Sequence, residues 1–187
     1  GMYSLNVTAK GGYTPEKGWD ENKLDFFRRH IVQLGRSGLF VVYDELVGKE
    51  PVEWNYLLHT VELPMEVAEE KDGLRILGKN KADGVSIAHL FSSQKMTYAQ
   101  TDTFFVAAVD WKKRLGKTLS NHYHFTATTA SCSKICFLNV IDVHGNNRAD
   151  AVINRERNRI TVEEWVIECN LEGEGNAFLY IENKQNG

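Results

Sequence analysis

The sequence predicts an all-β fold, an antiparallel two-sheet β-sandwich in which residues 1–187 form a single domain. Short runs rich in Val, Ile, Phe, Tyr and Thr recur between clusters of turn residues, and no segment keeps a helical apolar period over three turns. Only three prolines occur, all at expected turns or strand ends. With 187 residues and 42% hydrophobic content, the chain is long enough to bury one sizeable core.

In the first half of the chain, pairs of β-prone runs flank turn signals. The run after Leu34 contains GRSG followed by LFVVY, and NKADG follows Lys79. Gly, Asn and Asp in such clusters favour tight turns between antiparallel strands. The strands expected here are 2–9, 25–34, 38–47, 52–63, 73–79 and 84–92.

The second half repeats this organisation. HGNN after Val143 and EGEGN after Leu171 mark two further turns. Because the connections between so many strands are short, antiparallel pairing within a sandwich is expected. The strands expected here are 97–109, 119–128, 134–144, 150–156, 159–169 and 176–183.

Overall charge and hydropathy exclude some classes of partner. The formal net charge of -3 gives no electrostatic reason to expect nucleic acid or an anionic membrane as partner. No apolar run is long enough to span a bilayer, and no signal peptide is visible in this chain.

The three cysteines do not form a disulfide framework. Cys132 and Cys136 would lie ~13 Å apart in an extended strand, too far for a bond. Cys169 could pair with either one across strands, although buried free thiols are the favoured interpretation.

Titratable residues occur on three consecutive expected strands. Strand alternation places His30 with Val32 and Leu34, and the later His59 with Leu57 and Val61. If the strands are neighbours in a meander, His30, Asp44 and His59 could converge as ligands of Zn²⁺. The favoured alternative is that Arg28 or Arg29 pairs with Asp44 or Glu45 and that the histidines donate to backbone carbonyls, because ligands on sheets have no diagnostic sequence spacing.

The other candidate residues have simpler interpretations. His122 and His124 share a polar strand face that can hold a metal but is expected to meet solvent. His89 is expected to be a hydrogen-bonded core histidine. Trp19 and Trp111, in loop-like contexts, could stack on sugar rings or cover the ends of the sheets. No self-contained catalytic motif is visible, so no catalytic residue is predicted.

The segment FRRHIVQLGRSGLFVVYDELVGKEPVEWNYLLHT, followed by NHYHFTA and KICFLNVIDV, resembles the C-terminal β-sheet domain of heparinase II/III-like polysaccharide lyases. The likeness is closest to the Bacteroidetes-type group and runs from about Lys23 to the last strand. It rests on an extended pattern, an Arg-rich strand, VVYDEL and a strand ending LLHT, more than on one invariant motif.

The resemblance implies a parent protein in which an N-terminal (α/α) toroid precedes the β-domain. Such proteins cleave uronic-acid-containing polysaccharides, glycosaminoglycans among them, by β-elimination, and are periplasmic or secreted. Their Tyr and His acid–base residues, and the Asn or Arg that neutralises the uronate, belong mostly to the toroid. The chain alone is therefore expected to be inactive, with the toroid or an acidic polysaccharide as partner.

Some relatives hold a structural zinc in the sandwich through two His and an Asp. The resemblance places His59 at the later His of that set, and His30 lies on the strand that carries the Asp. The alternative functions are a stand-alone carbohydrate-binding module or a structural module without catalysis. In the structural alternative, the former toroid interface is an apolar patch that a homo-oligomer would cover.

Overall fold

The computed structural model describes residues 2–10, 24–35, 37–61, 63–102 and 122–185. All regular elements in these ranges are antiparallel strands, and no described helix could cross a membrane. Their bounds are β1 Met2–Lys10, β2 Leu24–Leu34, β3 Leu39–Val52, β4 Asn55–Val61, β5 Glu66–Glu70, β6 Gly73–Lys79, β7 Gly84–Ser92, β8 Met96–Thr101, β9 His122–Thr129, β10 Cys132–Gly145, β11 Ile153–Glu156, β12 Arg159–Val162, β13 Trp165–Cys169 and β14 Leu179–Asn183.

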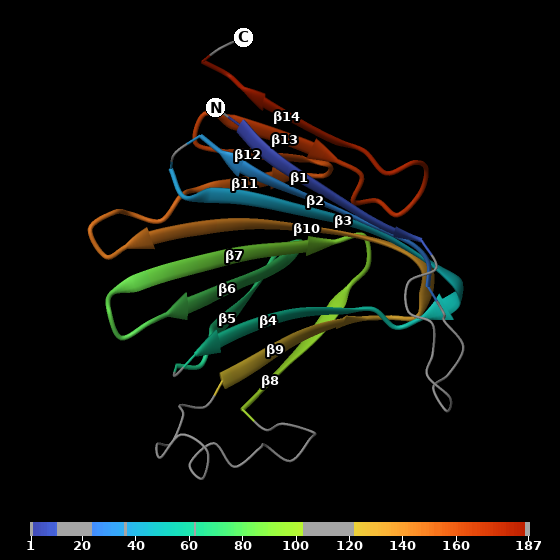
Figure 1. The fold of residues 1–187 in the computed structure, drawn as a ribbon, viewed down its shortest axis with the longest axis horizontal. Helices are drawn as coiled ribbons and strands as arrows, with labels where there is room; N and C mark the ends of the chain where they lie inside the picture. The colour runs from blue at the N-terminus through green and yellow to red at the C-terminus, as the bar shows by residue number, and fades with distance from the viewer. Residues whose placement is uncertain (1, 11–23, 36, 62, 103–121, 186–187) are drawn as a thin grey trace.

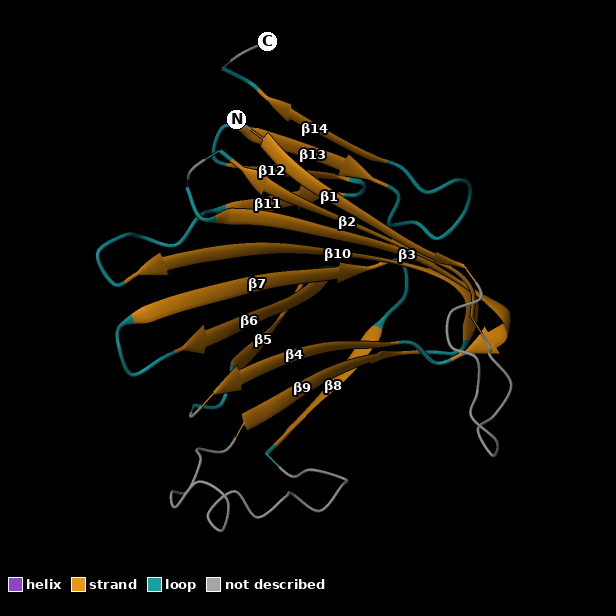
Figure 2. Cartoon of the chain, in the orientation of Figure 1, coloured by secondary structure: helices purple, strands orange, loops and turns teal. Residues whose placement is uncertain are grey.

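The described strands form three sheets. A seven-stranded sheet has the order β1-β2-β3-β10-β7-β6-β5, a four-stranded sheet the order β11-β12-β13-β14, and a three-stranded sheet the order β4-β9-β8. Figure 1 shows the large sheet between the two smaller ones, and Figure 2 shows the same layers as strands joined by short loops. The predicted all-β antiparallel class is confirmed, but its strands divide among three sheets where two were expected.

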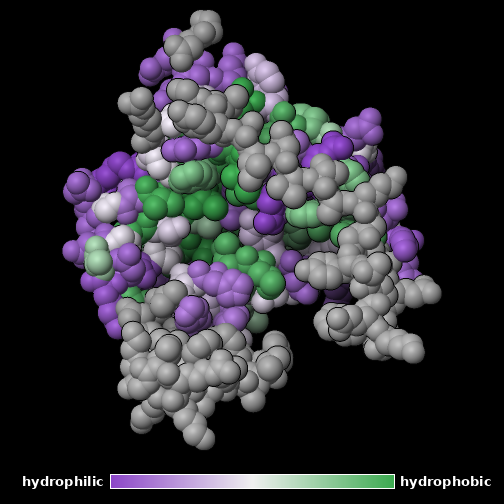
Figure 3. Space-filling view, viewed as in Figure 1, coloured by the Kyte–Doolittle hydropathy of each residue, from purple (hydrophilic) through white to green (hydrophobic). Residues whose placement is uncertain are grey.

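Alternation along β10 explains how one sheet serves two cores. Leu138 and Val140 pack toward the four-stranded sheet, whereas Ile135 and Phe137 pack toward the three-stranded sheet. Successive side chains of a strand point to opposite faces, so a strand that is apolar at nearly every position can be covered on both sides. We call the seven-stranded sheet the central sheet. Apolar side chains also gather in the middle of the face shown in Figure 3, with hydrophilic ones around them.

Several strand bounds differ from the expectation, and two of the differences concern whole elements. The predicted strand 159–169 is a hairpin, β12 and β13, because Glu163 adopts a positive φ of 50° and the chain reverses there. The strand β5 was not predicted, because its sequence EVAEE has no apolar alternation. The bounds of 73–79 and 84–92 are confirmed as β6 and β7.

Candidate functional site

The predicted zinc residues lie on opposite sides of the central sheet. His30 is on β2, opposite Tyr43 of β3, with ring centroids 6.4 Å apart on the face that meets the four-stranded sheet. His59 is on β4, in the three-stranded sheet that covers the other face. The two histidines therefore cannot bind one ion, because the expected meander is interrupted when the chain leaves the central sheet after β3.

His59 instead meets His124 of β9, directly opposite in the strand register. The Nε2 of His59 lies 3.0 Å from the Nδ1 of His124, and the rings meet edge to face. Among the described residues, no group of three His, Cys, Asp or Glu side chains is arranged to hold a metal ion. This histidine pair offers two imidazoles to a metal and does not complete a zinc site by itself.

The arginine and aspartate of the neighbouring strands form an ion pair, as the favoured alternative predicted. Arg29 donates from Nε and Nη2 to the two carboxylate oxygens of Asp44, each at 2.7 Å. These hydrogen bonds raise the pKa of the Arg29 guanidinium, while burial opposes the shift. The Asp44 carboxylate is therefore committed to Arg29.

The remaining residues that were predicted from the sequence are His30, His89, the three cysteines and two tryptophans. Burial first, and then the charge of Arg28, lower the pKa of His30. His89 is buried and its Nδ1 lies 3.2 Å from a carboxylate oxygen of Glu70, which confirms a hydrogen-bonded core histidine. The three cysteines are free thiols. Trp19 and Trp111 lie outside the described residues.

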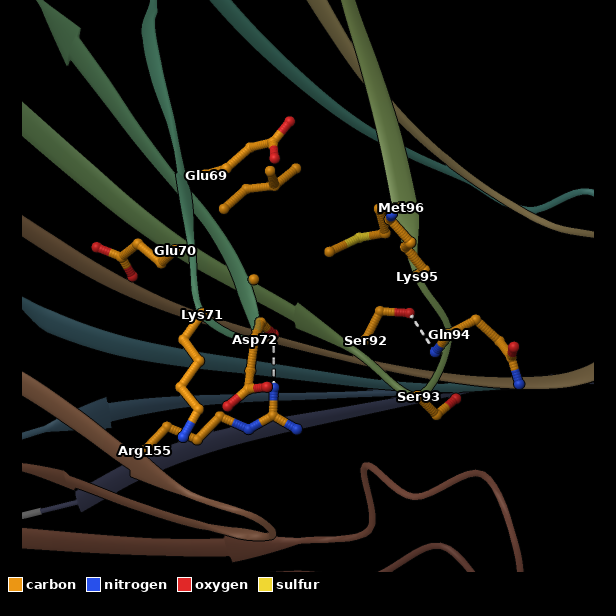
Figure 4. A pocket seen from close by; sticks show the side chains of 12 residues that line it. Glu69, Glu70, Lys71, Asp72, Ser92, Ser93, Gln94, Lys95, Met96 and Arg155 are labelled. Atoms are coloured by element: carbon orange, nitrogen blue, oxygen red, sulfur yellow. Dashed lines mark hydrogen bonds between the residues drawn. The ribbon is translucent and has the colours of Figure 1, made fainter.

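A polar groove that the sequence did not indicate opens beside the central sheet, with a volume of about 540 Å³. It lies where the turn from β5 to β6 faces the connection from β7 to β8, and one residue of β11 reaches it (Figure 4). The lining residues, which we call the polar groove, are Glu69, Glu70, Lys71, Asp72, Gly73, Leu74, Ser92, Ser93, Gln94, Lys95, Met96 and Arg155.

Arg155 is fixed in this groove by neutral partners. Its guanidinium lies over the Phe91 ring, 5.1 Å from the centroid. Nη1 donates to the Asp72 carbonyl at 2.6 Å, and Nε donates to the Arg157 carbonyl at 2.9 Å. Burial lowers the pKa of Arg155, and the nearby Asp72 carboxylate opposes that shift. Within the described residues, Arg155 makes no ion pair with a carboxylate, so its charge is compensated mainly by carbonyl dipoles.

A glycine keeps the β5–β6 turn close to this arginine. A Cβ at Gly73 would lie 2.5 Å from the Leu90 carbonyl oxygen and 2.7 Å from the Phe91 ring. Backbone and a buried ring cannot move away cheaply, so a larger residue would displace the turn. Gly73 therefore allows the Asp72 carbonyl to reach Arg155.

Two serine hydroxyls on the opposite wall are held by backbone donors. Ser92 Oγ accepts from the Gln94 N–H at 3.0 Å, and Ser93 Oγ accepts from the Cys136 N–H at 3.1 Å. A hydroxyl that accepts in this way still has its own hydrogen to donate. Both serines therefore remain available as donors at fixed positions.

The comparisons with known proteins concern the fold. No family model matches the chain, and no curated protein matches its sequence. A crystal structure of heparinase III is similar with a TM-score of 0.57 and 14% identity, over 96% of this chain and 26% of that one. A second heparinase III gene product gives a TM-score of 0.50 and 14% identity, over 94% of this chain and 27% of that one.

The heparan sulfate lyase HepC from Pedobacter heparinus gives a TM-score of 0.47 and 12% identity, over 96% of this chain and 26% of that one. The chain thus spans about a quarter of the length of these solved structures. The predicted resemblance to heparinase-type lyases is confirmed at the level of the fold: this chain has the architecture of one part of heparinase III.

Proposed function

We propose that the chain is the C-terminal β-domain of a heparinase II/III-like polysaccharide lyase. The observation that carries the proposal is the fold likeness to heparinase III, which extends over 96% of this chain. The parent protein would cleave a uronic-acid-containing polysaccharide by β-elimination and would be periplasmic or secreted. Because fold alone does not define activity, the reaction needs a direct assay.

Within such a parent, the role of this domain is structural. It packs against an (α/α) toroid and completes one wall of the substrate cleft, while the toroid supplies most of the acid–base residues. The ion pairs within the described residues are consistent with a structural role, because they join side chains of this domain to each other. The pair of Arg29 and Asp44 is one example, with Asp44 only 2% exposed.

The test compares the chain alone with the complete protein encoded by the open reading frame in which it occurs. Both are incubated with heparan sulfate, hyaluronan and alginate, and the ultraviolet absorbance of unsaturated uronate products is followed. We expect turnover by the complete protein and none by the chain. Turnover by the chain alone would contradict the structural role, and a complete protein without a helical toroid would contradict the lyase assignment.

Zinc binding by His59 stays a prediction, with His124 in place of His30 as its companion. The Nε2 of His59 and the Nδ1 of His124 lie within hydrogen-bonding distance of each other, so a zinc ion bound by both nitrogens would replace this contact. Elemental analysis of protein purified without chelators would show zinc, and His59→Ala would remove it. Zinc retained by His59→Ala, or absent from the unaltered protein, would exclude this ligand role.

A carbohydrate-binding module without catalysis is the second candidate function. The polar groove favours it, since fixed donors in a concave site are what hydroxyl-rich ligands require. This candidate predicts binding by the isolated chain even where the complete protein shows no lyase activity.

A further inference from the structure

We propose that the polar groove is a binding subsite for an oxyanion carried by a saccharide, a carboxylate or a sulfate, with Arg155 as its principal donor. The saccharide part of this inference rests on the proposed function, whereas the oxyanion part rests on the groove itself. The groove involves none of the residues singled out from the sequence, and it is separated from His59 by its place in the fold.

Several hydrogen-bond donors of the groove are unused within the described residues. The Nη2 of Arg155 has no acceptor among the described residues, and the hydrogens of Ser92 and Ser93 are likewise unused. Figure 4 shows the guanidinium beneath Asp72, with the two serines across the groove. A planar guanidinium with neighbouring hydroxyls is a recognised receptor for carboxylate and sulfate oxygens, which accept charge-assisted hydrogen bonds.

The cations of the groove also lack direct ion-pair partners among the described residues. Lys71 and Lys95 are exposed and, like Arg155, form no ion pair with any described carboxylate. Of the carboxylates along the groove, Glu70 is committed to His89 at 3.2 Å, and Figure 4 shows it directed away from the serines. An incoming anion would therefore meet three positive groups whose charge is not neutralised by a direct partner.

The remaining carboxylates explain why the ligand should be a saccharide and not a bare ion. Glu69 and Asp72 are exposed at the groove and accept hydrogen bonds only. They would repel a small free anion but can accept from sugar hydroxyls that lie beside the oxyanion. A volume of about 540 Å³ lies within the range of small-molecule sites, enough for a sugar residue and its substituent.

The preorganisation of Arg155 strengthens the assignment. The Phe91 ring and two carbonyls fix the guanidinium before any ligand arrives, so binding costs little side-chain entropy. A surface arginine that served only solubility would need none of these contacts. Gly73 contributes by holding the Asp72 carbonyl in place.

The experiment is a titration of the 187-residue chain followed by backbone amide chemical shifts in NMR. The ligands are hyaluronan oligosaccharides for uronate alone, heparan sulfate oligosaccharides for uronate with sulfate, neutral chitin oligosaccharides, and inorganic sulfate. We expect the acidic oligosaccharides to shift the amides of residues 71–73 and 92–95. Binding by hyaluronan would identify the carboxylate, and binding by heparan sulfate alone would identify the sulfate.

The variants separate the groove from general electrostatics. Lys71→Gln combined with Lys95→Gln should weaken acidic oligosaccharide binding about tenfold, since two favourable charges are lost. The control combines Lys49→Gln with Lys184→Gln, two exposed lysines that do not line the groove, and should change binding by less than about twofold. Arg155→Gln should weaken binding at least about tenfold, and a thermal melt would show that it remains folded.

Several results would overturn the proposal. Equal binding of neutral oligosaccharides would exclude an oxyanion subsite, and saturation by inorganic sulfate without oligosaccharide binding would exclude the saccharide. Equal losses in the groove and control variants would place the interaction elsewhere. If the complete protein is a lyase but no oligosaccharide binds at the groove, only this inference fails. If the groove binds acidic oligosaccharides and the complete protein has no lyase activity, only the proposed function fails.

Discussion

The two faces of the central sheet differ in how their polar groups are used. On the face toward β11–β14, Tyr43 donates to the Asn170 carbonyl and Asp142 accepts from the Ala151 N–H, so both groups bind the backbone of later segments. On the face toward β4, β9 and β8, Arg29 binds Asp44 on the neighbouring strand of the same sheet. The four-stranded sheet is therefore tied to the central sheet through backbone groups of its loops, whereas the three-stranded sheet is tied through side chains on facing strands, where the Asn139 amide of β10 donates to the Tyr56 hydroxyl of β4.

The interface of the central sheet with the four-stranded sheet is closed to solvent, whereas its interface with the three-stranded sheet is partly open. The core toward the four-stranded sheet contains fully buried aliphatic side chains such as Leu138 and Ile167. The other interface opens into a mostly apolar groove of about 430 Å³ between β4 and the central sheet, which Ile141 lines. Side chains lost from a closed core leave a cavity, whereas those lost from an open groove leave space that water can reach.

The largest expected loss of stability comes from shortening side chains on β10 that face the two interfaces. Leu138→Ala on β10 should lower the free energy of unfolding by about 4 kcal/mol, and Ile141→Ala by only about 2 kcal/mol. Urea unfolding followed by tryptophan fluorescence measures both. Similar losses in the two variants would show that the two interfaces are equally closed.

The next largest loss of stability is expected from the ion pair of Arg29 and Asp44, on the face toward the three-stranded sheet. Asp44→Ala should cost about 2 kcal/mol, because it leaves Arg29 partly buried without its partner. Water reduces this loss in the free energy of unfolding, because the Arg29 side chain is 39% exposed and can be solvated once Asp44 is removed. The double variant Arg29→Ala with Asp44→Ala should cost less than the sum of the single variants, and strict additivity would show that the pair does not couple.

Two tyrosines allow a matched comparison of single hydrogen bonds. Tyr43→Phe removes the donor to the Asn170 carbonyl, and Tyr56→Phe removes the acceptor of the Asn139 side-chain amide. Each should cost about 1 kcal/mol, since a buried partner is left unsatisfied. Thermal unfolding of the two variants at one pH would measure the difference, and a neutral Tyr43→Phe would show that this loop contact is dispensable.

The last effect is absent at neutral pH and develops only at alkaline pH. Burial raises the pKa of the Cys169 thiol to about 12 from an ordinary 9.0, and burial also raises the pKa of Cys136. Between about pH 9 and pH 12 the Cys169 thiol therefore keeps its proton in the folded state, whereas the same thiol loses it in the unfolded state. The free energy of unfolding is thus unaffected below pH 9 and falls as the pH rises toward 12.

Thiol labelling checks the same burial directly. In native protein, Cys132 should react with a disulfide reagent while Cys136 and Cys169 remain protected until unfolding. Cys169→Ala should reduce the alkaline loss of stability. Rapid labelling of all three thiols in the native state would contradict a closed interface.

Local chemistry predicted much of the fold. The NKADG turn forms as expected, because Asn80 Oδ1 accepts from the Ala82 and Gly84 amides and Asp83 takes a positive φ of 63°. Strand alternation also placed side chains on the correct shared faces, as with His30 beside Val32. The turn at Glu163 was missed because the strand formers Val162 and Trp165 flank the Glu163–Glu164 pair, and no Gly, Pro, Asn or Asp marks a turn there.

The candidate sites were harder to predict, because they depend on which sheet each strand joins. His59 was expected near Asp44 from its order in the chain, but β4 pairs with β9 in another sheet. The polar groove combines Asp72, Ser93 and Arg155 from three segments that are distant in the sequence. Such a site forms through long-range contacts, for which a single sequence holds no periodic pattern.

The position of β10 has a consequence for how the chain folds. This strand lies between β3 and β7, yet it is synthesised after both of them. Until residue 145 has been made, the facing edges of β3 and β7 lack their partner, and neither core has its shared wall. Refolding must wait for contacts of large sequence separation, which makes it slow, and the open edges meanwhile can pair with other molecules. Soluble production of this chain therefore depends on how quickly β10 inserts.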